Sequence, residues 1–149
     1  MGHEYAVNRR ASFDYEILET FEAGIALRGF EVKAIKSGRV NLASSFVVVR
    51  NNEAWLINAS IPPYQPANTP ANYDPTQSRK LLLHQSQIKE ILGSASRAGL
   101  TLVPLKMYNK NKLIKLLIGL ARSKKKSDKR EVIKKREVKK EIARAIKRG

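Results

Sequence analysis

The amino-acid sequence predicts an α+β protein that is mainly β: a small antiparallel β-barrel with about two to three helices, followed by a basic tail. Its 149 residues suffice for one ordinary domain and not for two. Several short segments rich in β-branched and aromatic residues alternate with turn residues, and two other segments have helical spacing. Every Phe, Tyr and Trp lies before Arg122. We therefore expect the barrel in residues 1–121, and in residues 122–149 a tail that is disordered when free.

The first half of the chain contains a strand, a helix and a hairpin. Tyr15 to Phe21 alternates as a strand does, and residues 30–36 have the apolar spacing of a helix, with Gly38 placed to end it. Residues 46–50 and 54–58 are rich in Val, Ile and Trp and flank a pair of asparagines. This pattern predicts a β-hairpin.

A proline-rich segment separates the two halves of the predicted barrel. Residues 61–75 hold five of the six prolines, which excludes a central strand and predicts an extended loop. After it, Gln85 to Ala98 has apolar residues at helical spacing and is followed directly by a glycine, which predicts a helix. Leu100 to Tyr108 and Lys112 to Leu120 predict two more antiparallel strands, joined by a tight turn at residues 109–111.

The chain is strongly basic, with 29 Lys and Arg against 13 Asp and Glu and a formal net charge of +16. Residues 122–149 alone hold 14 basic and 4 acidic side chains. This charge indicates a polyanionic partner, nucleic acid first and an anionic membrane surface second. For a small basic barrel the oligonucleotide-binding type is favoured, because its curved sheet and loops present charges that follow a nucleic-acid backbone.

The sequence predicts a soluble, cytoplasmic protein. It contains no Cys, which is compatible with a reducing compartment, and residues 1–10 lack the apolar core of a signal peptide. The longest apolar stretches, such as Leu113 to Ala121, are too short to span a membrane. We expect no membrane partner.

No catalytic motif is present, so the sequence predicts a binding protein and not an enzyme. His3 and His84 are isolated, and we expect neither a metal nor another cofactor. Strand periodicity would place the carboxylates Glu16, Glu19, Glu22 and Glu31 mainly on exposed faces. The glycines lack the pattern of a phosphate-binding loop.

Two segments carry a binding signal. Asp74 to Leu83 joins an exposed turn to Arg79-Lys80 and then to three leucines, an arrangement that would hold charge beside the core. The cluster from Lys124 to Arg130 suits phosphate contact, although such runs also form unspecific tails. Farther on, Val138, Ile142 and Ile146 would share one side of a short basic helix that forms against RNA. A membrane-surface helix is disfavoured because that side has no Trp, Phe or Leu.

The order of five motifs resembles the small protein B family, the bacterial proteins that bind transfer-messenger RNA. These motifs are Asn8-Arg9-Arg10-Ala11, Phe21-Glu22-Ala23-Gly24-Ile25-Ala26-Leu27, Gly29-Phe30-Glu31-Val32-Lys33, the Asp74 to Leu83 segment, and Asp128-Lys129-Arg130. The resemblance covers nearly the whole chain. The alternative is a generic ribosomal or single-stranded RNA-binding protein with a basic tail, which would explain the charge but not the ordered motifs.

The resemblance implies a barrel that grips the tRNA-like part of transfer-messenger RNA, replaces the missing anticodon arm and delivers the RNA to stalled ribosomes for trans-translation. The tail would enter the decoding site of the small subunit and the empty messenger channel, with elongation factor Tu associated indirectly. Family motifs linked to RNA binding fall on Glu22, Leu82 and Lys115. A carboxylate beside RNA would orient a neighbouring Arg or Lys, or accept from a base amino group.

The expected RNA-binding residues are Arg9, Arg10, Glu22, Lys33, Arg79, Lys80, Leu82 and Lys115. The expected ribosome contacts of the tail are Lys124, Lys125, Lys126, Asp128, Lys129, Arg130, Val138, Ile142 and Ile146.

Overall fold

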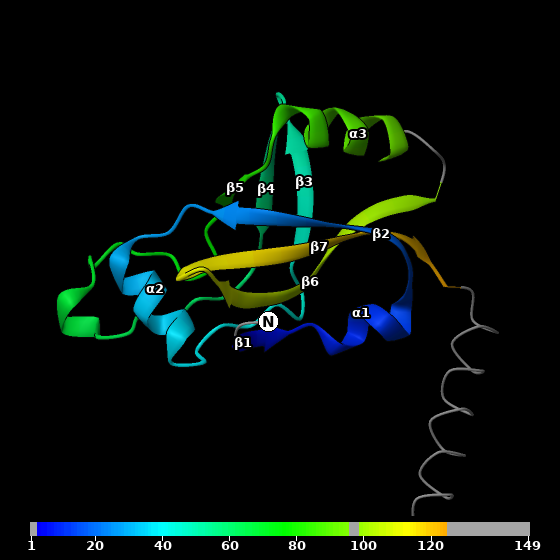
Figure 1. Cartoon of the computed structure of the whole chain (residues 1–149). Helices are drawn as coiled ribbons and strands as arrows, with labels where there is room; N and C mark the ends of the chain where they lie inside the picture. Colours follow the sequence, from blue (N-terminus) through cyan, green and yellow to red (C-terminus); the bar gives the residue numbers. More distant parts are fainter. Residues whose placement is uncertain (1–2, 96–98, 125–149) are drawn as a thin grey trace, which may run out of the picture.

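The computed structural model describes residues 3–95 and 99–124, which form a seven-stranded antiparallel sheet with three α-helices (Figure 1). The predicted α+β class is therefore confirmed. In chain order the elements are β1 (Glu4–Val7), α1 (Arg9–Asp14), β2 (Tyr15–Ile25), α2 (Gly29–Lys36), β3 (Phe46–Arg50), β4 (Glu53–Ile57), the 3-10 turn η1 (Pro66–Asn68), β5 (Arg79–Leu82), α3 (Gln85–Ala95), β6 (Leu100–Lys110) and β7 (Leu113–Ser123).

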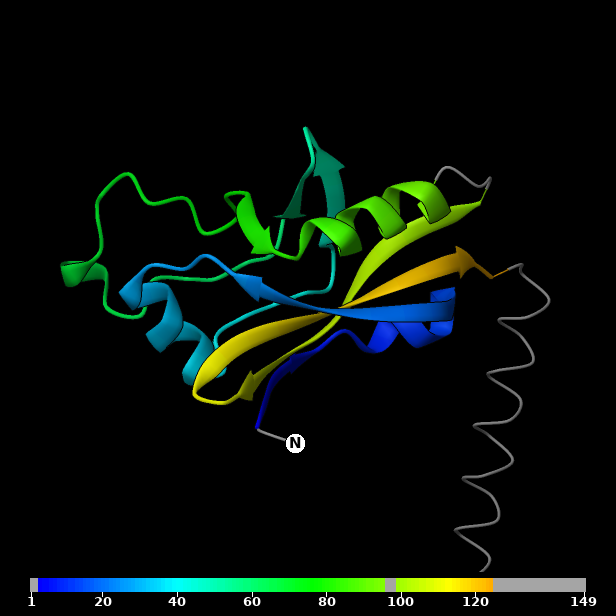
Figure 2. The ribbon, with the colours of Figure 1, turned by 45° about the horizontal axis from the view of Figure 1, so that its top comes forward.

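The sheet is not closed into a barrel, so that part of the prediction is wrong. Its strand order is β1-β6-β7-β2-β5-β4-β3, which leaves β1 and β3 at the two edges. Closure would require β3 to bond to the edge of β6, but β1 already pairs with β6 around Tyr108. Beyond that pairing, a cavity of about 570 Å³ lies between the start of β3 at Phe46 and the β6 residues Thr101 to Val103. The sheet is thus strongly curved but open (Figure 2).

The central strands are longer than predicted. β2 and β7 pair from Tyr15 opposite Ser123 to Gly24 opposite Lys115, with one bulge after Ile17. The turn between β6 and β7 is also tighter than expected. It consists of Asn111 and Lys112, with φ of 51° and 66°, and not of residues 109–111.

Local signals located the hairpin and the helix that follows Gly29. The β3–β4 hairpin turns at Asn51 and Asn52, whose φ values of 50° and 60° suit the left-handed turn that best matches strand twist. α2 ends before Gly38, which has a φ of 82°. Both predictions are confirmed, as is the helix beginning at Gln85.

The hydrophobic core lies on the inner side of the curved sheet. Successive side chains of a strand point to opposite faces, so the buried residues Ala23, Leu81 and Leu116 define the inner face of β2, β5 and β7. The helices add Ile35 from α2 and Ile91 from α3. On the outer face, Ala11 of α1, Val103 and Ala121 form a second, smaller buried cluster at one end of the sheet, and polar side chains lie farther along the same face. No helix among the described residues has the length and apolar character needed to cross a membrane.

Candidate nucleic-acid interface

Three predicted RNA-binding residues lie on the outer face of the sheet, on three neighbouring strands. In β2, Gly24 is opposite Lys115 of β7 and also opposite Leu82 of β5. Cross-strand partners share a face, and Glu22 lies two residues before Gly24 on that same face. The register of the sheet therefore brings Glu22, Leu82 and Lys115 together, although up to 93 positions separate them in the chain.

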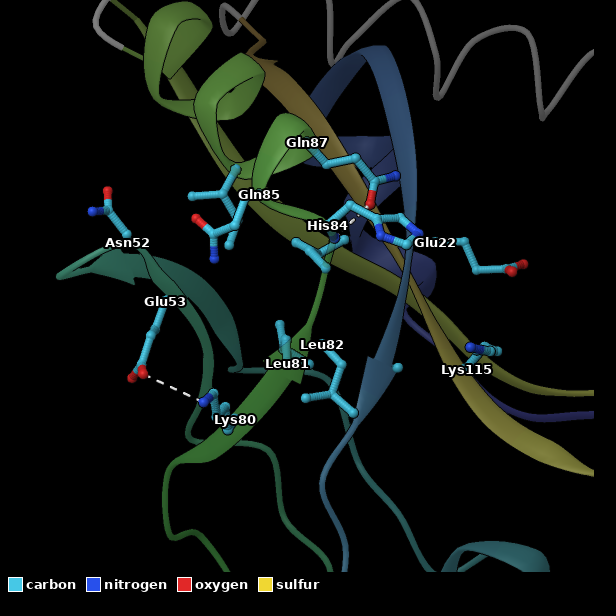
Figure 3. Close-up of a pocket in the computed structure, with 13 residues that line it drawn as sticks. Glu22, Asn52, Glu53, Lys80, Leu81, Leu82, His84, Gln85, Gln87 and Lys115 are labelled. Atoms are coloured by element: carbon cyan, nitrogen blue, oxygen red, sulfur yellow. Dashed lines mark hydrogen bonds and ion pairs between the residues drawn. The ribbon is translucent and has the colours of Figure 1, made fainter.

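These residues line a cavity of about 670 Å³, which we call the sheet-face pocket (Figure 3). Lys80 lies on the same face, and the start of α3 forms another wall through His84, Gln85 and Gln87. Gly24 allows β5 to approach closely, because a Cβ at this position would lie 3.2 Å from the Cβ of Leu82. The remaining lining residues are Asn52, Glu53, Leu81, Leu83 and Ile88.

Glu22 is held by two side chains of β6. The Tyr108 hydroxyl donates a short hydrogen bond to the Glu22 carboxylate, and Lys110 Nζ lies 3.1 Å from Glu22 Oε1. The hydrogen bond from Tyr108 and the charge of Lys110 lower the pKa of Glu22 below its ordinary value, whereas burial and the nearby carboxylate raise the pKa of Tyr108. Glu22 thus pairs with a neighbouring lysine, which is the arrangement that the first of the two interpretations of this carboxylate requires.

A second cavity, of about 570 Å³, continues the outer face on the other side of Glu22. It is lined by Lys106, Tyr108 and Lys110 of β6, together with Asn109, Asn111 and Leu117. Because Glu22 borders both cavities, they form one surface across β5, β2, β7 and β6.

Carboxylates neutralise most of the lysines on this surface. Lys80 lies 3.3 Å from Glu53, and Lys106 lies 3.1 Å from Glu4. Lys115 forms no ion pair with the described acidic residues, although its charge contributes to the lowered pKa of Glu22. Lys115 is consequently the pocket cation most available to an external phosphate.

Arg79 is not on this surface, and in this respect the structure corrects the predicted set. Its side chain is 2% exposed and forms an ion pair of 2.7 Å with Glu31 of α2. Glu31 is also buried, contrary to the expectation that it lies on an exposed face. The guanidinium also donates to the carbonyls of Ala59, Gln77 and Pro75 and to the hydroxyl of Tyr73. Arg79 therefore anchors the proline-rich loop and β5 to α2.

The other predicted residues do not line the sheet-face pocket. Arg9 and Arg10 are exposed on α1, where Arg10 lies 3.6 Å from Asp14, and Lys33 is exposed on α2. Lys124 caps α1 by donating from Nζ to the carbonyl of Ser12 at 2.8 Å. The remaining tail predictions lie outside the described residues: Lys125, Lys126, Asp128, Lys129, Arg130, Val138, Ile142 and Ile146.

Sequence reasoning missed the polar residues that α3 and β6 add to the surface. The signal for His84 was local: three residues later Gln87 returns its side chain to the backbone N–H of His84 at 3.1 Å, as in a capping box. Tyr108 and Lys110 were detectable only as outward positions of a strand. Among the described residues no cluster of His, Asp or Glu could hold a metal ion.

Replacing Glu22 with glutamine should reduce stability at neutral pH but not in acid. A lowered pKa stabilises the fold above the unfolded-state value, for which 4.5 is the ordinary figure, and this stabilisation disappears as pH falls through the folded-state pKa. Urea unfolding at several pH values should show the difference between wild type and Glu22→Gln shrinking in acid. Tyr108→Phe removes the main cause of the lowered pKa and should flatten the profile; an unchanged profile would contradict the assignment.

Comparison with known proteins gives the family. A family model described as "SmpB protein" matches residues 5–148. An SsrA-binding protein of Gloeothece citriformis is 52% identical over 95% of this chain and 91% of its own length, and one of Acaryochloris marina is 51% identical over 100% and 99%. A solved chain from the structure described as "tmRNA-SmpB: a journey to the center of the bacterial ribosome" superposes with a TM-score of 0.66 at 47% identity, covering 86% of this chain and 93% of that one. The chain therefore belongs to the SmpB family, whose members are RNA-binding proteins and not enzymes.

Proposed function

We propose that this protein binds the tRNA-like part of transfer-messenger RNA through the outer face of its sheet and delivers that RNA to stalled ribosomes for trans-translation. One observation carries the proposal: Glu22, Leu82 and Lys115, which the family motifs link to RNA, meet in the sheet-face pocket. The relatives named SsrA-binding proteins and the similar ribosomal tmRNA-SmpB chain support the same partner.

Each pocket residue has a distinct role in this proposal. Lys115 binds a phosphate of the RNA backbone, because no described carboxylate neutralises it. Glu22 fixes Lys110 and Tyr108, so that the second cavity presents an ordered cation. Leu82, which is 55% exposed, makes an apolar contact with a sugar or base. Arg79 acts indirectly by holding β5, which carries both Lys80 and Leu82.

The finer steps are also proposals. The folded body takes the place of the missing anticodon arm, and the basic tail enters the decoding site of the small subunit and the empty messenger channel. Lys124 to Lys126, the Asp128-Lys129-Arg130 motif and the Val138, Ile142 and Ile146 stripe would make those contacts. Elongation factor Tu would join through the RNA, and the site of action would be the cytoplasm.

Competition binding at fixed salt tests the proposal against a generic RNA binder. The full chain and a chain ending at Lys124 are titrated with transfer-messenger RNA in the presence of bulk tRNA or single-stranded RNA. We choose Lys124 as the end point because β7 runs to Ser123 and Lys124 caps α1. Selective binding by both chains is expected, since shape recognition lies in the folded body. Loss of selectivity with the tail, or equal binding of all RNAs, would favour the generic binder.

A further inference from the structure

The helix α2 end of the molecule carries positive charge that the fold leaves unneutralised. On the outer face of the sheet, Glu53, Glu4 and Glu22 pair with Lys80, Lys106 and Lys110. On α2, by contrast, the side chains of Lys33 and Lys36 are exposed and make no ion pair or hydrogen bond with the described residues. Among the described residues, carboxylates therefore neutralise fewer of the lysine charges around α2 than on the predicted RNA-binding face.

The acidic groups near α2 are already engaged elsewhere. Glu31, the acidic residue of α2, is buried and bonded to Arg79 at 2.7 Å, and its other oxygen accepts from the backbone N–H of Arg28 at 2.9 Å. In the adjoining loop, Asp74 accepts hydrogen bonds from the backbone and hydroxyl of Thr76. Neither carboxylate forms an ion pair with the two exposed lysines of α2.

A third lysine extends this charge onto the turn between β6 and β7. Lys36 and Lys112 line one shallow cavity of about 170 Å³, together with Val32 and Leu113. Figures 1 and 2 both show α2 beside this turn. Lys112 is exposed and, among the described residues, has no ion-pair partner. We name Lys33, Lys36 and Lys112 the α2 basic surface.

The α2 basic surface adjoins the candidate interface across one turn. Lys110 and Asn111 line the cavity that contains Glu22, whereas Lys112 and Leu113, the next two residues, line the cavity beside α2. A polyanion lying on the outer face near Lys110 would therefore meet the α2 lysines if its backbone continued past the turn. Different phosphates of one such polyanion would then contact the outer face of the sheet and the α2 basic surface.

We propose that the α2 basic surface is a second contact for the same transfer-messenger RNA, one that binds backbone phosphates and reads no bases. Unpaired lysines on a helix and a turn are point charges that attract phosphates without base discrimination. The surface then adds affinity and salt dependence, while selectivity stays with the sheet-face pocket. This inference rests on the proposed function.

The test compares two triple variants of the full chain. Lys33→Gln, Lys36→Gln and Lys112→Asn together remove the surface; asparagine is used in the turn because it tolerates the positive φ of 66°. The control, Arg50→Gln, Lys89→Gln and Arg122→Gln, removes the same number of charges from β3, α3 and β7. Binding to transfer-messenger RNA and to bulk tRNA is measured over a range of salt, with thermal unfolding as the check on folding.

The α2 variant should reduce the slope of log affinity against log salt by about one for each lysine, more than the control does, with the preference for transfer-messenger RNA retained. The inference would be overturned if the wild-type protein selects transfer-messenger RNA but the salt slope of the α2 variant equals that of the control variant. Binding of both variants to ribosomes is measured as well. Weaker ribosome binding of the α2 variant with an unchanged transfer-messenger RNA slope would also overturn the inference, because the surface would then serve ribosomal RNA. A wild type without selectivity would instead contradict the proposed function.

Discussion

Replacing Arg79 with methionine should lower the free energy of unfolding by about 3–5 kcal/mol, since removal of one member of a buried ion pair leaves the other charge without compensation. Here Glu31 would stay buried beside an apolar side chain. The carbonyls of Ala59, Gln77 and Pro75 would lose their guanidinium donor as well. The proline-rich loop should loosen at its base as a result.

Urea unfolding of Arg79→Met measures this loss in the free energy of unfolding, and Lys80→Met, at the neighbouring position, is the control. Lys80 is also paired, but its side chain is 45% exposed, and exposed pairs contribute only about 0–1 kcal/mol. Removing both buried charges in Glu31→Leu/Arg79→Met should cost less than the sum of the single replacements. Equal losses from Arg79→Met and Lys80→Met would show that the buried pair does not anchor the loop.

Replacing Lys115 with glutamine should weaken binding of transfer-messenger RNA by about 10- to 150-fold. A hydrogen bond to a charged group contributes about 1.5–3 kcal/mol, and about 1.4 kcal/mol corresponds to a tenfold change in affinity. The loss should be large because the other pocket lysine, Lys80, already pairs with Glu53. Filter binding at fixed salt gives the ratio of dissociation constants.

Lys89→Gln is the matched control for Lys115→Gln, because it removes the same charge from the exposed side of α3. It should change affinity only through the general electrostatic attraction of a basic protein for RNA. If the two variants weaken binding equally, Lys115 contributes net charge and no specific contact, and the sheet-face pocket is not the recognition site.

The parts of the fold that were predictable depend on neighbouring residues. The hairpin follows from two asparagines that tolerate positive φ, and the end of α2 follows from Gly38. Barrel closure was mispredicted because it depends on which strand occupies the edge of β6. Strand β1 was not predicted, and its Glu4 is the register partner of Tyr108 in β6. A strand of four residues carries no sequence pattern that identifies a partner so distant in the chain.

The candidate site shows the same limit at the level of single residues. Arg79 and Lys80 are adjacent, so their side chains must point to opposite faces of the strand, but the three leucines that follow allow either register. The pairing of β5 with β4 and β2 determines that Leu81 faces the core. Arg79, two residues earlier, therefore faces the core as well. Family motifs located Glu22, Leu82 and Lys115, whereas the roles of Tyr108 and Glu31 required the packed structure.

Photocrosslinking from position 82 tests the central claim most directly. A benzophenone side chain replaces Leu82 on the sheet-face pocket or, as the control, Phe46 on β3, which is 45% exposed and lines the separate cavity at the open edge of the sheet. We expect the benzophenone at position 82 to crosslink to labelled transfer-messenger RNA. Unlabelled transfer-messenger RNA should compete for this crosslink, whereas bulk tRNA should not. The benzophenone at position 46 should crosslink weakly. Efficient crosslinking from position 46 with little from position 82 would contradict the assignment of the sheet face as the RNA-binding surface.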